Sequence, residues 1–142
     1  MPRGRLPDGL ARFLAAARPA VVSTLGPGGE PATAAVWYLF TDGRLLLSMD
    51  AAGPRCRNLR ADDRIALTVL ADDWYNHVSL LGRAVELRDD PDFVDVDRLS
   101  LHYRGTPYEP RDWSPVTAIV EIQRWHTYGD PAAQSAPAGE TR

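Results

Sequence analysis

Two arginines at the start of a short predicted helix are the residues of this sequence best suited to bind a ligand. The segment PRCRNLRADD comes directly after a predicted strand and places Arg55 and Arg57 near the helix start. Unpaired backbone N–H groups at a helix N-terminus attract anions, and a guanidinium adds a planar fork that matches phosphate or carboxylate. The segment therefore predicts a site for an anionic group. The alternative is a solvated helix face, to which we assign Arg60.

The other reactive side chains lack the partners that catalysis or metal binding requires. Cys56 lies beside these arginines, where a helix start lowers a thiol pKa, but no recognisable base accompanies it. His102 and His126 have no identifiable partner, and three scattered histidines with one cysteine do not approach a metal-ligand set. No Walker loop, dinucleotide fingerprint or G-x-S-x-G motif is present. We therefore expect no metal, and we interpret GPGG at 26–29 as a hairpin turn.

The elements that would position these side chains are mainly strands. Apolar runs between turn residues predict six strands, and helical spacing predicts three short helices. Gly82 predicts a bulge or a close backbone approach. Six strands make an antiparallel barrel the expected architecture, since closure removes exposed edges. The strands are expected at 20–25, 31–40, 44–49, 65–70, 76–87 and 116–122, the helices at 8–18, 54–63 and 89–104, and an irregular loop at 105–115.

Composition limits the class of protein. The 142 residues suffice for one domain with a conventional core, which we place at 1–129, followed by a small, polar, disordered tail at 130–142. The net charge of −3 gives no reason to expect nucleic acid or an anionic membrane as a partner. No apolar run approaches the ~20 residues that cross a bilayer, and the first residues lack the apolar stretch of a secretory signal. A single cysteine suits a reducing compartment, so we expect a soluble, cytoplasmic protein.

Three segments in a fixed order resemble a known family: GEPATAAVWY at 29–38, RCRNLRADDRIALTV at 55–69 and LLGRAVEL at 80–87. They are similar to the split β-barrel flavin and deazaflavin oxidoreductases, the relatives of pyridoxamine 5′-phosphate oxidase, over roughly residues 10–129. Within that superfamily the chain most resembles the actinobacterial branch that uses the deazaflavin coenzyme F420. The resemblance implies a mainly β (α+β) fold, a six-stranded antiparallel split β-barrel of Greek-key, FMN-binding type with a few short helices. It also implies a homodimer that holds the cofactor at the subunit interface.

The resemblance assigns the anionic groups of the cofactor to the basic helix. Arg55, Arg57 and Asn58 match the family's helix start, which holds the phosphate and the acidic tail. Many relatives have lysine at the position of Arg55, and arginine keeps the charge. Ser48 matches a hydroxyl that often meets the phosphate. For Asn58 the alternative is that it braces the loop and does not touch the ligand.

The resemblance places the cofactor ring beside the second strand. The backbone of Val36 and Trp37 would line the ring edge. Adjacent strand residues point to opposite faces, so only one of Trp37 and Tyr38 can lie over the ring, and we favour Trp37. His77 matches a position at the ring edge, and His77 and Tyr103 are the candidate proton donors. No obligatory acid or base stands out, so the catalytic residues stay unassigned.

The expected function is F420-dependent reduction, in which reduced F420 passes hydride to an electron-poor organic acceptor. The acceptor would be an activated C=C, a quinone-like ring or a tetrapyrrole. FMN oxidases of the superfamily carry an arginine and a lysine where this chain has Ala34 and Leu39, which counts against FMN. The alternatives are an FMN-dependent oxidase or reductase, and a non-catalytic protein that binds the cofactor or a ligand. We expect the acceptor pocket at the N-terminal helix, the 74–76 turn and the 103–113 loop.

Overall fold

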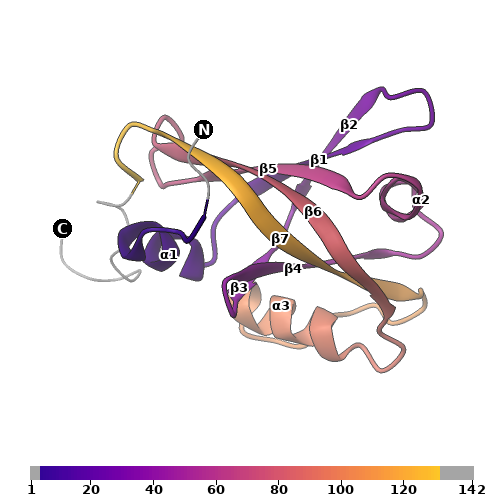
Figure 1. Ribbon diagram of the computed structural model, residues 1–142. Coiled ribbons are helices and arrows are strands. Elements are labelled where there is room, and N and C mark those ends of the chain that lie inside the picture. Colours follow the sequence, from indigo (N-terminus) through magenta and orange to yellow (C-terminus); the bar gives the residue numbers. More distant parts are fainter. Residues whose placement is uncertain (1–3, 132–142) are drawn as a thin grey trace.

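Figure 1 shows a computed structural model of the chain, in which residues 4–131 are described. Strands dominate that part of the chain, and every pair of neighbouring strands runs antiparallel. The mainly β, α+β class with three short helices is confirmed within these residues. The elements are α1 (Asp8–Ala15), β1 (Ala20–Leu25), β2 (Pro31–Val36), β3 (Leu39–Thr41), β4 (Arg44–Asp50), α2 (Pro54–Ala61), β5 (Arg64–Leu70), β6 (His77–Asp89), α3 (Val94–Arg104) and β7 (Pro115–Tyr128).

The sheet has seven strands in the order β2-β1-β5-β6-β7-β4-β3, so the prediction of six strands closing into a barrel is wrong in this respect. The segment predicted as one strand at 31–40 is two strands. Its first part pairs with β1, and its last part pairs with β4 near the other edge of the sheet. The backbone must leave β1 to reach β4, so Trp37 and Tyr38 between them belong to neither ladder. The two edges are therefore joined by the chain itself and not by hydrogen bonds between strands.

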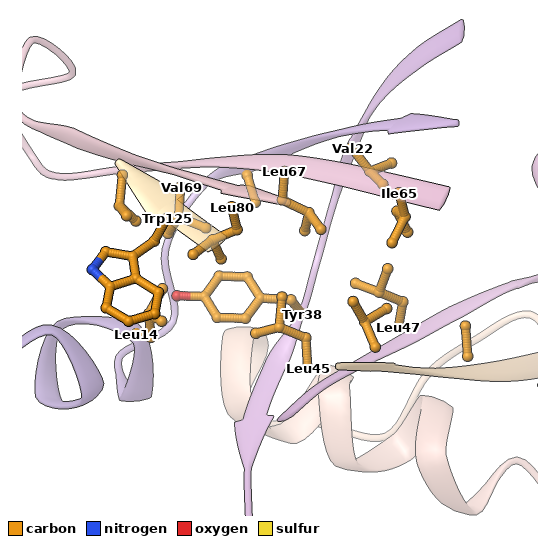
Figure 2. Packing of buried hydrophobic residues seen from close by; sticks show 14 of the residues in the cluster. Leu14, Val22, Tyr38, Leu45, Leu47, Ile65, Leu67, Val69, Leu80 and Trp125 are labelled. Atoms are coloured by element: carbon orange, nitrogen blue, oxygen red, sulfur yellow. The ribbon is translucent and has the colours of Figure 1, made fainter. Parts of the chain in front are cut away.

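The core lies inside the curve of this sheet, where alternate residues of the strands are buried. Tyr38 is completely buried, and Figure 2 shows its ring in the middle of the cluster with its hydroxyl toward Leu14 and Trp125. That hydroxyl donates a hydrogen bond to the carbonyl of Ala16, at 3.1 Å. Helix α1 covers this part of the core with its buried apolar face. The core packing and this hydrogen bond therefore hold Tyr38, between β2 and β3, in place.

Turn and bulge predictions agree with the structure. The GPGG turn closes the β1–β2 hairpin, with the N–H of Gly26 donating to the carbonyl of Glu30 at 2.8 Å. The β3–β4 turn has positive φ at both Asp42 and Gly43, as a tight hairpin requires. At Gly82 the β6–β7 register shifts, and a Cβ there would overlap the carbonyl oxygen of Glu121. The predicted close backbone approach at Gly82 is confirmed.

Three predicted boundaries are wrong. Helix α1 ends at Ala15 and not at 18, because Ala16 is already extended. Helix α3 begins at Val94 and not at 89, because the carboxylate of Asp90 accepts the first backbone N–H groups of the helix and so defines its start. Strand β7 extends to Tyr128 because its second half continues to pair with β6. The predicted tail lies almost wholly outside the described residues.

Helix α2 lies between two parts of the sheet that are far apart in the strand order, since it contacts both β1 and β4. Its buried residues are Cys56, Asn58 and Leu59, and the Asn58 side-chain amide donates to Thr24 Oγ1 at 3.1 Å. This bond ties α2 to β1, while the turn in which the Gly53 N–H donates to the Asp50 carbonyl places the helix start next to the end of β4. No helix among residues 4–131 is both long enough and apolar enough to span a membrane.

Candidate functional site

A cavity of about 750 Å³ lies where the β2–β3 junction, the end of β4, the start of α2 and helix α3 meet. Five residues predicted from the sequence line it together: Val36, Trp37, Ser48, Arg55 and Tyr103. They come from four elements (β2, β4, α2 and α3) and the β2–β3 junction, so only the fold brings them to one place. We call the part around Ser48 and Arg55 the polar end, and the part formed by Trp37, Tyr103, Tyr108 and Trp113 the aromatic end.

The polar end has hydrogen-bonding atoms without partners. Ser48 Oγ and Arg55 Nε are buried, and neither has a hydrogen-bond partner among the described residues. Burial lowers the pKa of Arg55 because the charged guanidinium loses water. Helix α2 begins with Pro54 and has no side-chain cap, so its first N–H groups are also unpaired. Buried polar atoms in proteins are nearly always paired, so this end is suited to an anionic or hydrogen-bonding ligand.

A carboxylate borders the same end. Asp50 lines the cavity, and its Oδ1 accepts the backbone N–H of Ala52 at 3.0 Å in the turn that leads into α2. Arg55 is the one cation on the cavity lining within residues 4–131. The polar end therefore combines one buried cation with one carboxylate that is held by the backbone.

The aromatic end is built from stacked and edge-on rings. Trp37 stacks on Tyr103 with ring centroids 5.2 Å apart and planes 13° apart. Tyr108 meets Trp37 edge-on, at 6.2 Å and 83°, and Trp113 meets Tyr108 at 5.6 Å and 70°. Because aromatic rings attract other rings in offset and edge-on arrangements, this end is suited to a flat conjugated group.

The phenol of Tyr103 is occupied by the backbone at the β2–β3 junction. Its hydroxyl donates to the carbonyl of Arg18 at 2.7 Å and accepts the N–H of Tyr38 at 3.2 Å. Burial raises the pKa of Tyr103. The Tyr38 N–H lies outside both strand ladders, so Tyr103 supplies the partner that the sheet does not. As a candidate proton donor, Tyr103 would have to give up its bond to Arg18.

The remaining predicted residues do not line this cavity. Arg57 is exposed, and its Nη1 donates to the carbonyl of Ala52 at 2.9 Å. Asn58 braces α2 against β1, the alternative that the sequence left open. His77 begins β6 at the end of β5 that is remote from α2, and it stacks on Tyr128 at 5.4 Å and 9°.

Sequence reasoning did not single out Tyr108, Trp113 or Asp50. The expectation that the 103–113 loop shapes a pocket covers the first two, but a proline-rich segment without periodicity gives no means of choosing residues within it. The 74–76 turn does not line the cavity, and the N-terminal helix is represented by residues just after it, Ala17 and Pro19. The described residues contain no group of three side chains that could hold a metal ion.

Comparison with known proteins supports the fold and gives the family. A solved F420 reductase has a TM-score of 0.76 and 22% identity, covering 85% of this chain and 98% of that one. A conserved hypothetical protein from Mycobacterium tuberculosis gives 0.70 and 23%, covering 99% and 94%. General Stress Protein 26 from Bacillus anthracis gives 0.64 and 12%, covering 85% and 92%. The family model described as pyridoxamine 5′-phosphate oxidase matches residues 6–128. The chain belongs to the pyridoxamine 5′-phosphate oxidase family.

Proposed function

We propose that this protein is an F420-dependent reductase, which binds reduced F420 in the cavity between α2 and α3 and reduces an electron-poor organic acceptor. The observation that carries the proposal is the pair of buried, unpartnered polar atoms, Ser48 Oγ and Arg55 Nε, in one cavity with an aromatic end. The two ends match a ligand that joins an anionic tail to a flat ring. Family membership supports the coarser statement, an oxidoreductase-like protein with a flavin-type cofactor.

The residues present fit such a cofactor. Arg55 and Ser48 would hold its phosphate, and the unpaired N–H groups at the start of α2 add further donors. Val36 and Trp37 would border its ring. When bound, reduced F420 supplies the hydride. The chain itself positions the reactants, excludes water with its aromatic end, and holds the β2–β3 junction in place through Tyr103.

The charge of the cavity counts against FMN. The phosphomonoester of FMN carries about −1.5 to −2 charges at neutral pH, as other phosphomonoesters do. Arg55 is the single cation on the described lining, and the two positions that are cationic in the FMN oxidases are the uncharged Ala34 and Leu39. Without those two cations, the single buried arginine beside Asp50 is a weak site for a doubly charged phosphomonoester.

The proposal includes a homodimer with the cofactor at the subunit interface. His77 and Arg57 do not line the cavity of their own subunit, so they would contribute to cofactor binding only at the boundary with a second copy. Val21 and Leu81 are 39% and 41% exposed on the outer face of the sheet, where a partner would cover them. A proton for the reduced acceptor would come from solvent or from such a residue. The catalytic residues stay unassigned.

The first test is titration of the full chain with F420 and, separately, with FMN, following tryptophan fluorescence. We expect tighter binding of F420, and Arg55→Ala should weaken it about tenfold to a hundredfold, the value of a charge-assisted hydrogen bond. Arg60→Ala is the matched control, since Arg60 is exposed on the same helix and outside the cavity. Its affinity should equal that of the wild type.

Other outcomes would contradict parts of the proposal. Preference for FMN would move the protein to the FMN-dependent oxidases or reductases. Tight F420 binding with no oxidation of reduced F420 across a broad acceptor panel would favour the non-catalytic carrier. An Arg55→Ala variant that binds F420 like the wild type would remove the polar end from the proposed site.

A further inference from the structure

The segment between α3 and β7 brings two rings to the cavity without regular secondary structure of its own. It runs from Gly105, which ends α3 with a positive φ of 77°, to Ser114, before β7. Tyr108 and Trp113 lie in it and line the cavity. Because no helix or strand ladder fixes this segment, its side-chain contacts must decide where the two rings lie.

One ion pair accounts for most of those contacts. The carboxylate of Asp97, on α3, accepts hydrogen bonds from Arg111 Nη1 and Nη2, both at 2.9 Å. Asp97 Oδ1 also accepts the backbone N–H of Tyr108 at 3.0 Å, and Arg111 Nη1 donates to the carbonyl of Tyr108 at 3.0 Å. The pair therefore holds both backbone polar groups of Tyr108. Two parallel bonds between guanidinium and carboxylate give this arrangement a defined geometry.

The ion pair reaches the cavity only through the rings that it positions. Neither Asp97 nor Arg111 lines the cavity. The guanidinium of Arg111 lies 4.7 Å from the ring centroid of Phe93, and Phe93 meets Trp113 edge-on at 5.5 Å. Trp113 Nε1 donates to the carbonyl of Pro110 at 2.9 Å, within the same segment. Releasing Asp97 would thus free Tyr108 and Trp113 together.

We propose that Asp97 and Arg111 are positioning residues for the aromatic end, which they hold in the arrangement that binds a flat, uncharged, conjugated ring. The aromatic end carries no formal charge, and a charged group would lose its water there without a compensating partner. Flat rings gain contact with the edges and faces of Trp37, Tyr108 and Trp113. The inference rests on the proposed function in taking this cavity as the ligand site, and it adds the two residues that hold the ring-binding end in place.

The test measures ring binding without any cofactor. Naphthoquinone is titrated into the full chain, and quenching of tryptophan fluorescence gives its dissociation constant. Decalone, a saturated and non-planar ketone of similar size, is then added as a competitor. We expect wild-type protein to bind naphthoquinone more tightly than decalone. Asp97→Asn should weaken naphthoquinone binding about threefold to tenfold, the value of one aromatic contact, and narrow the preference over decalone.

Asp62→Asn is the matched control. Asp62 also pairs with an arginine, Arg64, through bonds of 3.0 and 2.7 Å, and also accepts a backbone N–H, but neither residue lines this cavity. Its naphthoquinone affinity should equal that of the wild type. Arg111→Lys keeps the charge but loses the fork, so it should fall between the wild type and Asp97→Asn. Circular dichroism in the near ultraviolet reports whether the tyrosine and tryptophan rings have lost their fixed environment.

The possible outcomes separate the inference from the proposed function. Wild-type binding and ring preference in Asp97→Asn would overturn it, as would an equal loss in Asp62→Asn. Should Asp97→Asn fail to fold, Arg111→Lys carries the same comparison. If neither F420 nor FMN binds, the proposed function fails, yet the naphthoquinone comparison still stands. If F420 binds and naphthoquinone does not, the inference alone fails.

Discussion

At the scale of single residues, the hydroxyl of Tyr103 pairs with two backbone groups beside the junction that joins the two sheet edges. The two edges of the sheet are joined through Trp37 and Tyr38, whose backbone belongs to neither ladder. The Tyr103 hydroxyl accepts the Tyr38 N–H and donates to Arg18, while its ring stacks on Trp37. One side chain therefore satisfies the junction and also forms part of the cavity wall.

We expect Tyr103→Phe to lower the free energy of unfolding by about 1–3 kcal/mol, because the Tyr38 N–H and the Arg18 carbonyl lose a partner. The ring stays, so naphthoquinone affinity should change little. Tyr108→Phe is the control, since the Tyr108 hydroxyl has no hydrogen-bond partner among residues 4–131. Urea denaturation of the two variants and the wild type measures the difference. Equal stability of Tyr103→Phe and Tyr108→Phe would contradict this account.

The charge of Asp97 is a second single-residue feature, and it makes the stability of the folded chain depend on pH. Its hydrogen bonds with Arg111 hold the pKa of its carboxyl at about 2, below the value of about 3.9 expected in the unfolded chain. The unfolded state therefore binds a proton at higher pH than the folded state does. The stability that Asp97 contributes is complete above about pH 5 and is lost as the pH falls through the unfolded pKa toward the folded pKa.

We therefore expect acid to destabilise the wild type more than a variant without this carboxyl. Between about pH 5 and 2.5, the melting temperature of the wild type should fall more steeply than that of Asp97→Asn, which has no carboxyl to protonate at this position. Above that range the difference between the two proteins should be constant. Thermal melts across a pH series measure both slopes. Parallel curves across the whole range would show that the ion pair does not stabilise the folded state.

At the scale of elements, the β6–β7 pair depends on one position without a side chain. Gly82 sits at a register shift, where β7 passes close to the backbone of β6. A Cβ at this position would overlap the Glu121 carbonyl and lie 3.1 Å from Val120 Cγ1. The obstacle is backbone, which cannot rotate away as a side chain can.

Gly82→Ala should therefore destabilise the protein by about 1–3 kcal/mol, the usual cost of forcing extra volume into a packed region. Gly28→Ala is the matched control. Its Cβ would lie 2.7 Å from Glu30 Oε2, the end of an exposed and flexible side chain that can move aside. We expect the control to stay within about 0.5 kcal/mol of the wild type in urea denaturation. A stable Gly82→Ala variant would mean that the two strands can separate at little cost.

At the scale of the whole molecule, the outer face of the sheet carries a small uncharged patch bordered by Arg64, Arg83 and Arg124. Ser23, Ala66 and Leu81 lie side by side across β1, β5 and β6, and Val21 and Thr68 form the next row. Val21 and Leu81 are exposed. Exposed apolar side chains rimmed by polar and charged residues are typical of protein–protein contacts, so we place the proposed homodimer interface there.

We expect the wild type to sediment as a dimer and Leu81→Glu to sediment as a monomer, because a buried charge without a partner opposes association. If the cofactor lies at the interface, the monomeric Leu81→Glu variant should also bind F420 more weakly than the wild type. Leu101→Glu, at an exposed apolar position on α3, is the control and should remain dimeric. A monomeric wild type would contradict the homodimer, and a dimeric Leu81→Glu would contradict the choice of face.

Local patterns in the sequence were enough to predict most strands, the basic helix and the hairpin turns. Pro54 begins α2 as expected, because proline suits a first helical turn. Gly82 marks a close approach because only glycine fits one. These features depend on a few neighbouring residues, and their backbone preferences act in any fold. The split of 31–40 into two strands was not predictable in this way, because it depends on β4 lying at the other edge of the sheet.

Some features of the candidate site also follow from local sequence, and others depend on the tertiary structure. That Trp37 and Tyr38 face opposite ways follows from the period of extended backbone, whereas Trp37 on the cavity and Tyr38 in the core depend on where the sheet curves. The sequence by itself determined that the start of α2 is basic and suited to an anion. Only the tertiary structure decided that Arg55 lines the cavity while Asn58 braces β1. Residues three apart share one helix face, and this face meets the cavity at the helix start and β1 one turn later. The arrangement of the aromatic end also depends on the tertiary structure, because the ion pair between Asp97 and Arg111 forms only when α3 and the loop after it meet.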